Sequence, residues 1–143
     1  MKVVALPEIA RYRVLFGDCD PMRIVYYANY LRFFEIGRAE LFRALGHPFA
    51  DYVAQGLYLA VIEAACRYHA PARYDDELRI HAGVTRIGRA RLTIAYEIRG
   101  PSAARLVTGH TQHAVLDDAG RPRRLPAGVR DALGSLASSH DTE

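Results

Sequence analysis

The longest regular pattern of hydrophobic residues in this chain has the period of an α-helix and runs from Tyr27 to Leu45. At 100° per residue, one wide face of the helix is apolar. The residues expected on that face are Tyr27, Tyr30, Leu31, Phe34, Leu41 and Leu45. Gly46 is a typical end for such a helix. Arg38 falls within the apolar face, and Glu35, one turn earlier, is the candidate partner for its charge.

Five β-strands are predicted around this helix from alternation of apolar and polar residues. The first covers Arg11 to Phe16, and the second is a long strand from Leu57 to His69. Two strands over residues 77–85 and 91–99 alternate cleanly, which suits antiparallel strands with one wetter face. The last strand, Leu106 to Leu116, does not alternate cleanly, as expected for a central strand buried on both faces.

The order of elements is therefore strand, helix and four strands, which predicts an α+β domain with one antiparallel sheet. Residues 1–9 form a loose lead-in, and short helices are expected from Pro48 to Gln55 and from Ala127 onward. A chain of 143 residues, half of them hydrophobic, fits a single domain, here residues 1–136. Residues 137–143 are expected to be a disordered tail. The pattern alone leaves several topologies open.

Composition excludes several classes of function. The net charge at pH 7 is +3, and no basic run is interleaved with aromatic residues, so nucleic acid is not expected as a partner. Scattered arginines suit a phosphorylated small ligand equally well. The N-terminus lacks the apolar core of a signal peptide, and no stretch of about 18 apolar residues predicts a membrane span.

Cysteines and histidines add no chemistry of their own. Cys19 and Cys66 are too few for a disulfide framework, so reduced thiols and a cytoplasmic location are expected. Cys19 lies between two acids, which disfavour its thiolate. His110 and His113 are three positions apart on a strand and face opposite sides, so no metal site is predicted among the six histidines.

The candidate chemistry lies directly before the long helix, in Asp18-Cys19-Asp20 and Pro21, which ends the preceding strand. A helix start offers unpaired backbone N–H groups and the positive end of the macrodipole. A carboxylate beside oriented donors can attack a carbonyl carbon or activate water for that attack. Taken locally, a turn or a helix cap is the more frequent role of such an aspartate.

The run FGDCDPMRIVYYANYLRFF, from Phe16 to Phe34, resembles the signature of the 4-hydroxybenzoyl-CoA thioesterase branch of the hotdog-fold superfamily. YHAPARYDD, from Tyr68 to Asp76, resembles that family's strand-to-strand connection, and the likeness extends from Arg11 to Pro126. The resemblance implies a hotdog fold, a curved five-stranded antiparallel sheet wrapped around one long central helix. It also implies a homodimer or homotetramer with active sites at the dimer interface.

The resemblance assigns roles to individual residues. It implies that Asp20 is the nucleophile or general base, and that the backbone N–H of Tyr27 polarises the thioester carbonyl. Asp18 is expected to hold the loop by accepting backbone N–H bonds. Arg89, and less closely Arg91, match a basic stretch that contacts coenzyme A phosphates in the family. A solvated hairpin explains either arginine equally well.

Arg23 is the main departure from the family pattern, because relatives commonly have glycine there. Glycine permits a positive φ and a close approach of substrate. Arginine leaves three options open: an outward side chain, contact with coenzyme A phosphates, or contact with a carboxylated acyl group. Glu63 is interpreted as the partner of a buried or interface arginine.

The predicted function is hydrolysis of an acyl-CoA thioester to free acid and coenzyme A, with no metal or redox cofactor. A thioesterase for acyl groups on acyl carrier protein is one alternative, favoured by a basic patch that attracts an acidic carrier. A hotdog protein that binds acyl-CoA without hydrolysis is another, and Arg23 keeps it open. A dehydratase, also found on this fold, is not supported, because this sequence shows no matching pair of a histidine and an acid.

Overall fold

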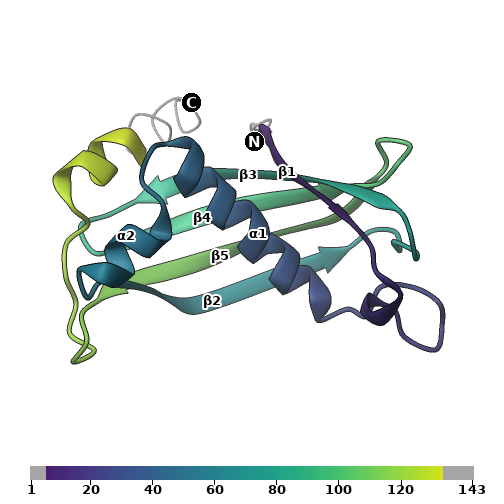
Figure 1. Ribbon diagram of the computed structural model, residues 1–143, viewed down its shortest axis with the longest axis horizontal. Coiled ribbons are helices and arrows are strands. Elements are labelled where there is room, and N and C mark those ends of the chain that lie inside the picture. The colour runs from purple at the N-terminus through teal and green to yellow at the C-terminus, as the bar shows by residue number, and fades with distance from the viewer. Residues whose placement is uncertain (1–5, 134–143) are drawn as a thin grey trace.

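One long helix lies across a curved antiparallel sheet in the computed structural model, which describes residues 6–133 (Figure 1). The sheet has five strands in the order β1-β3-β4-β5-β2. The strands are β1 (Glu8–Arg13), β2 (Tyr58–Tyr68), β3 (Glu77–Ile87), β4 (Arg91–Arg99) and β5 (Arg105–Leu116). The helices are α1 (Asn29–Ala44) and α2 (Phe49–Ala54), with a 3-10 turn η1 (Phe16–Asp18). This is the arrangement expected from the sequence.

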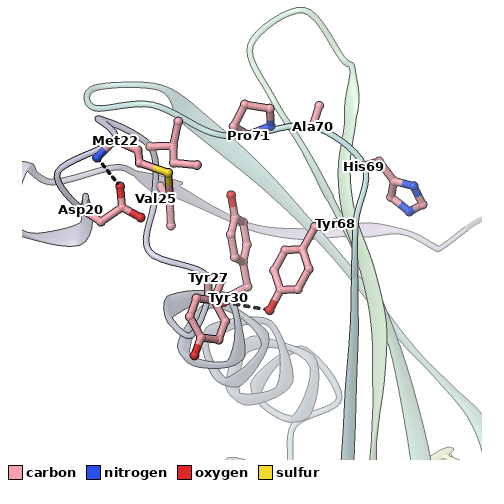
Figure 2. A pocket seen from close by; sticks show the side chains of 10 residues that line it. Asp20, Met22, Val25, Tyr27, Tyr30, Tyr68, His69, Ala70 and Pro71 are labelled. Atoms are coloured by element: carbon pink, nitrogen blue, oxygen red, sulfur yellow. Dashed lines mark hydrogen bonds between the residues drawn. The ribbon is translucent and has the colours of Figure 1, made fainter.

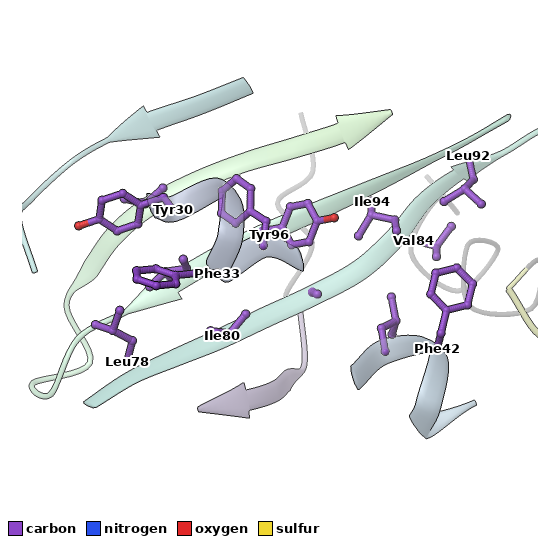
Figure 3. Close-up of a cluster of buried hydrophobic side chains, with 14 of the residues drawn as sticks. Tyr30, Phe33, Phe42, Leu78, Ile80, Val84, Leu92, Ile94 and Tyr96 are labelled. Carbon is purple, nitrogen blue, oxygen red and sulfur yellow. The ribbon is translucent and has the colours of Figure 1, made fainter. Parts of the chain in front are cut away.

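Helix α1 packs its aromatic face on the sheet (Figure 3). Its buried residues are Tyr30, Phe33, Phe34, Gly37, Leu41 and Phe42. Phe34 stacks on Tyr96 with ring centroids 4.3 Å apart. At Gly37 a Cβ would lie 2.8 Å from Ile80, so the missing side chain lets the helix approach β3 closely. The buried face is therefore centred on Phe34 and Gly37. Leu31, predicted to be buried, is 44% exposed.

Strands β3 and β4 supply most of the opposing core, and their predicted alternation is confirmed. Their buried residues are Leu78, Ile80, Ala82, Val84, Leu92, Ile94, Tyr96 and Ile98. Burial of each Leu or Ile side chain contributes roughly 1.5–3 kcal/mol. The helix therefore has a rigid apolar platform beneath it.

Strand β1 differs from its predicted bounds, Arg11 to Phe16, and includes residues 8 and 9 of the expected lead-in. It ends at Arg13 because the Asp18 carboxylate accepts the Leu15 N–H and draws the chain into η1. Phe16 consequently leaves the strand and is 79% exposed. A polar contact thus ends the strand before its apolar pattern stops.

Strand β5 lies inside the sheet, between β4 and β2, yet beyond the buried pair Leu106 and Val107 only one of its faces is buried. Thr111, His113 and Val115 are buried, whereas the alternating residues from His110 to Ala114 are partly exposed. From Thr108 onward the prediction of burial on both faces was wrong, because the helix covers one side of the sheet.

Two predicted charge pairs are replaced by other contacts. Arg38 donates to the Tyr96 hydroxyl at 3.1 Å, and within residues 6–133 it makes no ion pair with Glu35. Within residues 6–133, Glu63 lies 2.8 Å from His110 and makes no ion pair with an arginine, and an arginine partner across an interface stays a prediction. Both differences come from side chains on other strands, which a helical or local spacing does not reveal.

The remaining elements complete the fold. Helix α2 confirms the short helix predicted after Pro48, and residues 127–133 are helical, as predicted from Ala127. The predicted tail, residues 137–143, lies outside the described residues. Over the part of the chain that the structure covers, no helix has the length and apolar character needed to span a membrane.

Candidate active site

The loop before α1 is anchored by the carboxylate of Asp18, which is 5% exposed. Its Oδ2 accepts the Tyr12 hydroxyl at 2.6 Å and the Leu15 N–H at 2.8 Å. Its Oδ1 accepts Arg32 Nη2 at 2.5 Å. A buried carboxylate is stable only when such donors replace water. Asp18 therefore holds the loop, as expected, through two side chains as well as the backbone.

Asn29, which sequence reasoning missed, joins the same loop to the first turn of α1. Its Nδ2 donates to the Asp18 carbonyl at 2.8 Å, and the Tyr26 N–H donates to that carbonyl at 2.9 Å. Asparagine commonly bonds nearby backbone groups at helix starts. The position of Asn29 at the start of the predicted helix was the sequence feature that could have revealed this role. Its side chain fixes the loop relative to the helix.

Asp20 lies at the tip of this loop, in a tight turn. Its Oδ1 accepts the Met22 N–H at 2.8 Å, and its carbonyl accepts the Arg23 N–H at 2.8 Å. One carboxylate oxygen of Asp20 therefore has the role of a turn aspartate, as the local sequence suggested. The residue also lines a cavity (Figure 2), so the structural role does not exclude a chemical one.

Arg23 keeps the backbone conformation expected for glycine, with φ at +66°. This left-handed region costs an ordinary residue roughly 1–2 kcal/mol. Its side chain is exposed and is not among the residues that line the cavity. This arrangement agrees with an outward side chain, and contact of Arg23 with coenzyme A phosphates or with a carboxylated acyl group stays a prediction.

A cavity of about 370 Å³ lies between the Asp20 loop, the start of α1 and the end of β2 (Figure 2). Its lining residues are Asp20, Met22, Ile24, Val25, Tyr27, Tyr30, Tyr68, His69, Ala70 and Pro71. The two stretches that carry the family resemblance thus meet at one site. The lining is mainly apolar, with Asp20 as its carboxylate.

Tyr27 borders this cavity two residues before α1, which begins at Asn29 rather than at the predicted Tyr27. Within the described chain, its backbone N–H has no hydrogen-bond acceptor. Its carbonyl accepts the Tyr68 hydroxyl at 2.9 Å. The free N–H lies near the positive end of the helix macrodipole, where developing negative charge is favoured. Tyr27 thus offers the kind of donor that an oxyanion requires.

The aromatic wall of the cavity includes Tyr68, a second residue without a predicted role. Its ring meets Tyr30 edge to face, with centroids 5.6 Å apart. Burial raises the pKa of Tyr68 to about 12, so its hydroxyl remains a donor at neutral pH. Beside it, His69 Nε2 lies 2.9 Å from the Thr108 hydroxyl. The position of Tyr68 at the end of a predicted strand gave no sign that its ring meets α1.

Arg89 and Arg91 lie at the opposite end of the sheet from this cavity. Arg91 pairs with Ala114 on β5, whereas Tyr68 pairs with Val107, seven positions away. At about 3.4 Å per residue, these rungs are roughly 24 Å apart. One chain therefore does not bring the predicted phosphate ligands to the cavity.

Other reactive groups are weakly placed for chemistry. Burial, and then the carboxylates of Asp18 and Asp20, raise the pKa of the Cys19 thiol, which disfavours a nucleophilic thiolate. Among residues 6–133, no cluster of three or more His, Cys, Asp or Glu side chains has the geometry to hold a metal ion.

Residues 14–133 match the thioesterase-like superfamily. The chain belongs to this superfamily. A similar protein is the 1,4-dihydroxy-2-naphthoyl-CoA hydrolase of Thermosynechococcus vestitus, 29% identical over 90% of this chain and 92% of that protein. The acyl-CoA thioester hydrolase YbgC of Escherichia coli is 29% identical over 82% of this chain and 88% of that protein.

Structural similarity agrees with this membership. The crystal structure of a protein from Aquifex aeolicus superimposes with a TM-score of 0.84 at 30% identity, covering 89% of this chain and 99% of that one. The hotdog fold and the enzyme class predicted from the sequence, a thioester hydrolase, are confirmed. The narrower 4-hydroxybenzoyl-CoA branch stays a prediction.

Proposed function

We propose that this protein hydrolyses acyl-CoA thioesters to a free acid and coenzyme A, with Asp20 and Tyr27 as its catalytic residues. The observation that carries the proposal is that Asp20 and Tyr27 line one cavity at the start of α1, and that the Tyr27 N–H has no acceptor within residues 6–133. The E. coli relative is named an acyl-CoA thioester hydrolase, which supports the same class of substrate.

The proposed chemistry needs water as its second substrate and no metal or redox cofactor. Asp20 either attacks the thioester carbonyl, expelling the coenzyme A thiolate and leaving an anhydride that water cleaves, or removes a proton from the attacking water. In both routes the carbonyl oxygen becomes an oxyanion, which the Tyr27 N–H and the dipole of α1 stabilise. The Met22 N–H holds one Asp20 oxygen and orients the other.

Coenzyme A binding is proposed to need a second copy of the chain. Arg89 and Arg91 are too far along the sheet to reach phosphates at their own cavity. Strand β2 forms an edge of the sheet, and its apolar residues Val61 and Ile62 are exposed. An open edge strand of this kind pairs readily with another chain. A homodimer through β2, or a tetramer built from it, provides the missing arginines.

The test is release of free thiol from a panel of acyl-CoA esters with aromatic, short-chain and long-chain acids. Asp20→Asn keeps an oxygen for the Met22 N–H but removes the carboxylate, so kcat/KM is expected to fall about 100-fold or more. Asp51→Asn, at an exposed position on α2, is the matched control and should behave as wild type.

The other outcomes discriminate among the alternatives. Full activity in Asp20→Asn would mean that the site assignment is wrong. Binding of acyl-CoA without turnover in the wild type would favour the non-catalytic protein. Turnover confined to thioesters of acyl carrier protein would favour the alternative that the protein is an acyl carrier protein thioesterase.

A further inference from the structure

The turn that leads into α1 contains the peptide group that carries the Tyr27 N–H. The carbonyl of the same peptide group belongs to Tyr26, and it accepts the Asn29 N–H at 2.9 Å. A trans peptide group is planar, so its carbonyl and its N–H point in opposite directions and rotate together. The direction of the Tyr27 N–H is therefore set by the hydrogen bond that holds the Tyr26 carbonyl, and Asn29 is the donor of that bond.

Asn29 also holds the other end of this turn. Its side-chain Nδ2 donates to the Asp18 carbonyl at 2.8 Å, and the Tyr26 N–H donates to the same carbonyl at 2.9 Å. A carbonyl oxygen accepts hydrogen bonds over a broad range of angles, so a single bond to it allows rotation. Because two bonds from the turn converge on the Asp18 oxygen, they restrict the rotation that one bond allows.

The oxygen that receives both bonds is fixed without help from Asn29. Asp18 is 5% exposed, and its carboxylate is held by three donors that lie outside the turn. The side chains of the turn itself add little, since Tyr26 is 43% exposed and Tyr27 is 62% exposed. Removal of the Asn29 amide therefore loosens the turn and leaves its anchor in place.

We infer that Asn29 is a positioning residue for hydrolysis: its side-chain amide fixes the turn whose Tyr26–Tyr27 peptide presents the N–H to the oxyanion. The inference rests on the proposed function. Rate enhancement by a backbone donor depends on its direction, and a misplacement of about 1 Å can cost a large part of it. Asn29 acts through Tyr27 and Asp18, because it is not among the residues that line the cavity.

The experiment compares two substitutions of Asn29 with a matched control. Asn29→Ala removes the amide. Asn29→Ser keeps a residue that is favoured at helix starts, but its hydroxyl is one bond shorter and does not reach the Asp18 carbonyl. Gln55→Ala removes the same chemical group from an exposed position directly after α2.

Three quantities are measured for each protein. They are kcat and KM for the best acyl-CoA ester, the stability in urea, and the NMR order parameter of the Tyr27 amide, which reports backbone motion on the picosecond to nanosecond timescale. The urea curves establish that the variants are folded in the assay. If Asn29→Ala is unfolded there, Asn29→Ser carries the comparison.

For both Asn29 variants, kcat is expected to fall about tenfold with KM within about twofold of wild type, because the Tyr27 N–H acts on a charge that develops only in the transition state. The order parameter of the Tyr27 amide should fall as well. Gln55→Ala should leave kcat, KM and that order parameter unchanged. A selective loss of kcat separates positioning of the donor from binding of the substrate.

Wild-type kcat in the folded Asn29 variants would overturn the inference, as would a rise in KM with kcat unchanged. If the wild type hydrolyses no thioester, the proposed function fails, and the NMR comparison decides the positioning role alone. An order parameter of the Tyr27 amide that is the same in wild type and in the folded Asn29 variants overturns that role.

Discussion

Acid is expected to destabilise this protein through one buried histidine, His113 on β5. The side chain is fully buried, and its Nε2 lies 2.7 Å from the Thr111 hydroxyl. Its Nδ1 has no hydrogen-bond partner within the described residues. Burial, and then the nearby Arg38 guanidinium, lower the pKa of His113 from 6.5 to about 4. The folded protein therefore holds this imidazole neutral.

The sign of the effect follows from the direction of that shift. Below pH 6.5 the unfolded chain binds a proton at His113 that the folded chain refuses, so protonation favours unfolding. The contribution of neutral His113 to the free energy of unfolding is complete above the pKa of the unfolded chain, 6.5. It is lost as the pH falls toward the pKa of the folded chain, about 4. With pKa values of 6.5 and about 4, the free energy of unfolding falls by about 2 kcal/mol from pH 7.5 to pH 5.

The assay is urea unfolding followed by circular dichroism at several pH values from 7.5 to 5, at constant protein concentration. His113→Gln keeps a polar partner for Thr111 but does not titrate, so its pH dependence should be flatter by about 2 kcal/mol. Parallel curves for wild type and His113→Gln would refute the reasoning.

Two further substitutions test the backbone. Arg23→Gly is expected to stabilise the fold by about 1 kcal/mol in urea unfolding, because it removes the cost of a side chain at φ +66°; a destabilised variant would contradict this. Gly109→Ala would place a Cβ 2.2 Å from the Ala65 carbonyl and 2.7 Å from the Phe34 ring. It should cost more than about 2 kcal/mol, whereas Gly17→Ala, with nothing within 4 Å, should change stability by less than about 1 kcal/mol. Equal effects of the two alanines would contradict the predicted clash.

The secondary structure was largely predictable because hydrophobic periodicity is a local property. The period of the Tyr27 to Leu45 segment predicts α1, and the alternation of residues 91–99 predicts β4. The ends of elements were less predictable. Strand β1 stops early because a carboxylate five residues beyond its end accepts backbone and side-chain donors, a contact that no periodicity shows.

The candidate site was predictable only in part. The motif before α1 pointed to Asp20, and the cavity beside it is consistent with that choice. Asn29 and Tyr68 were missed as contributors, although both stand within stretches that resemble the family. Their roles depend on which backbone carbonyl each side chain reaches, and that distance is set by the packing of β2 and α1.

By itself, the sequence determined the order of one helix and five strands, and the presence of an acid before the helix. Tertiary structure alone decided that Arg38 meets Tyr96 instead of Glu35, and that Arg89 lies at the other end of the sheet from the cavity. The physical reason is the separation in sequence of the residues that interact. Helix and strand patterns arise between residues a few positions apart, whereas strand order and register bring distant residues together only when the whole core is packed.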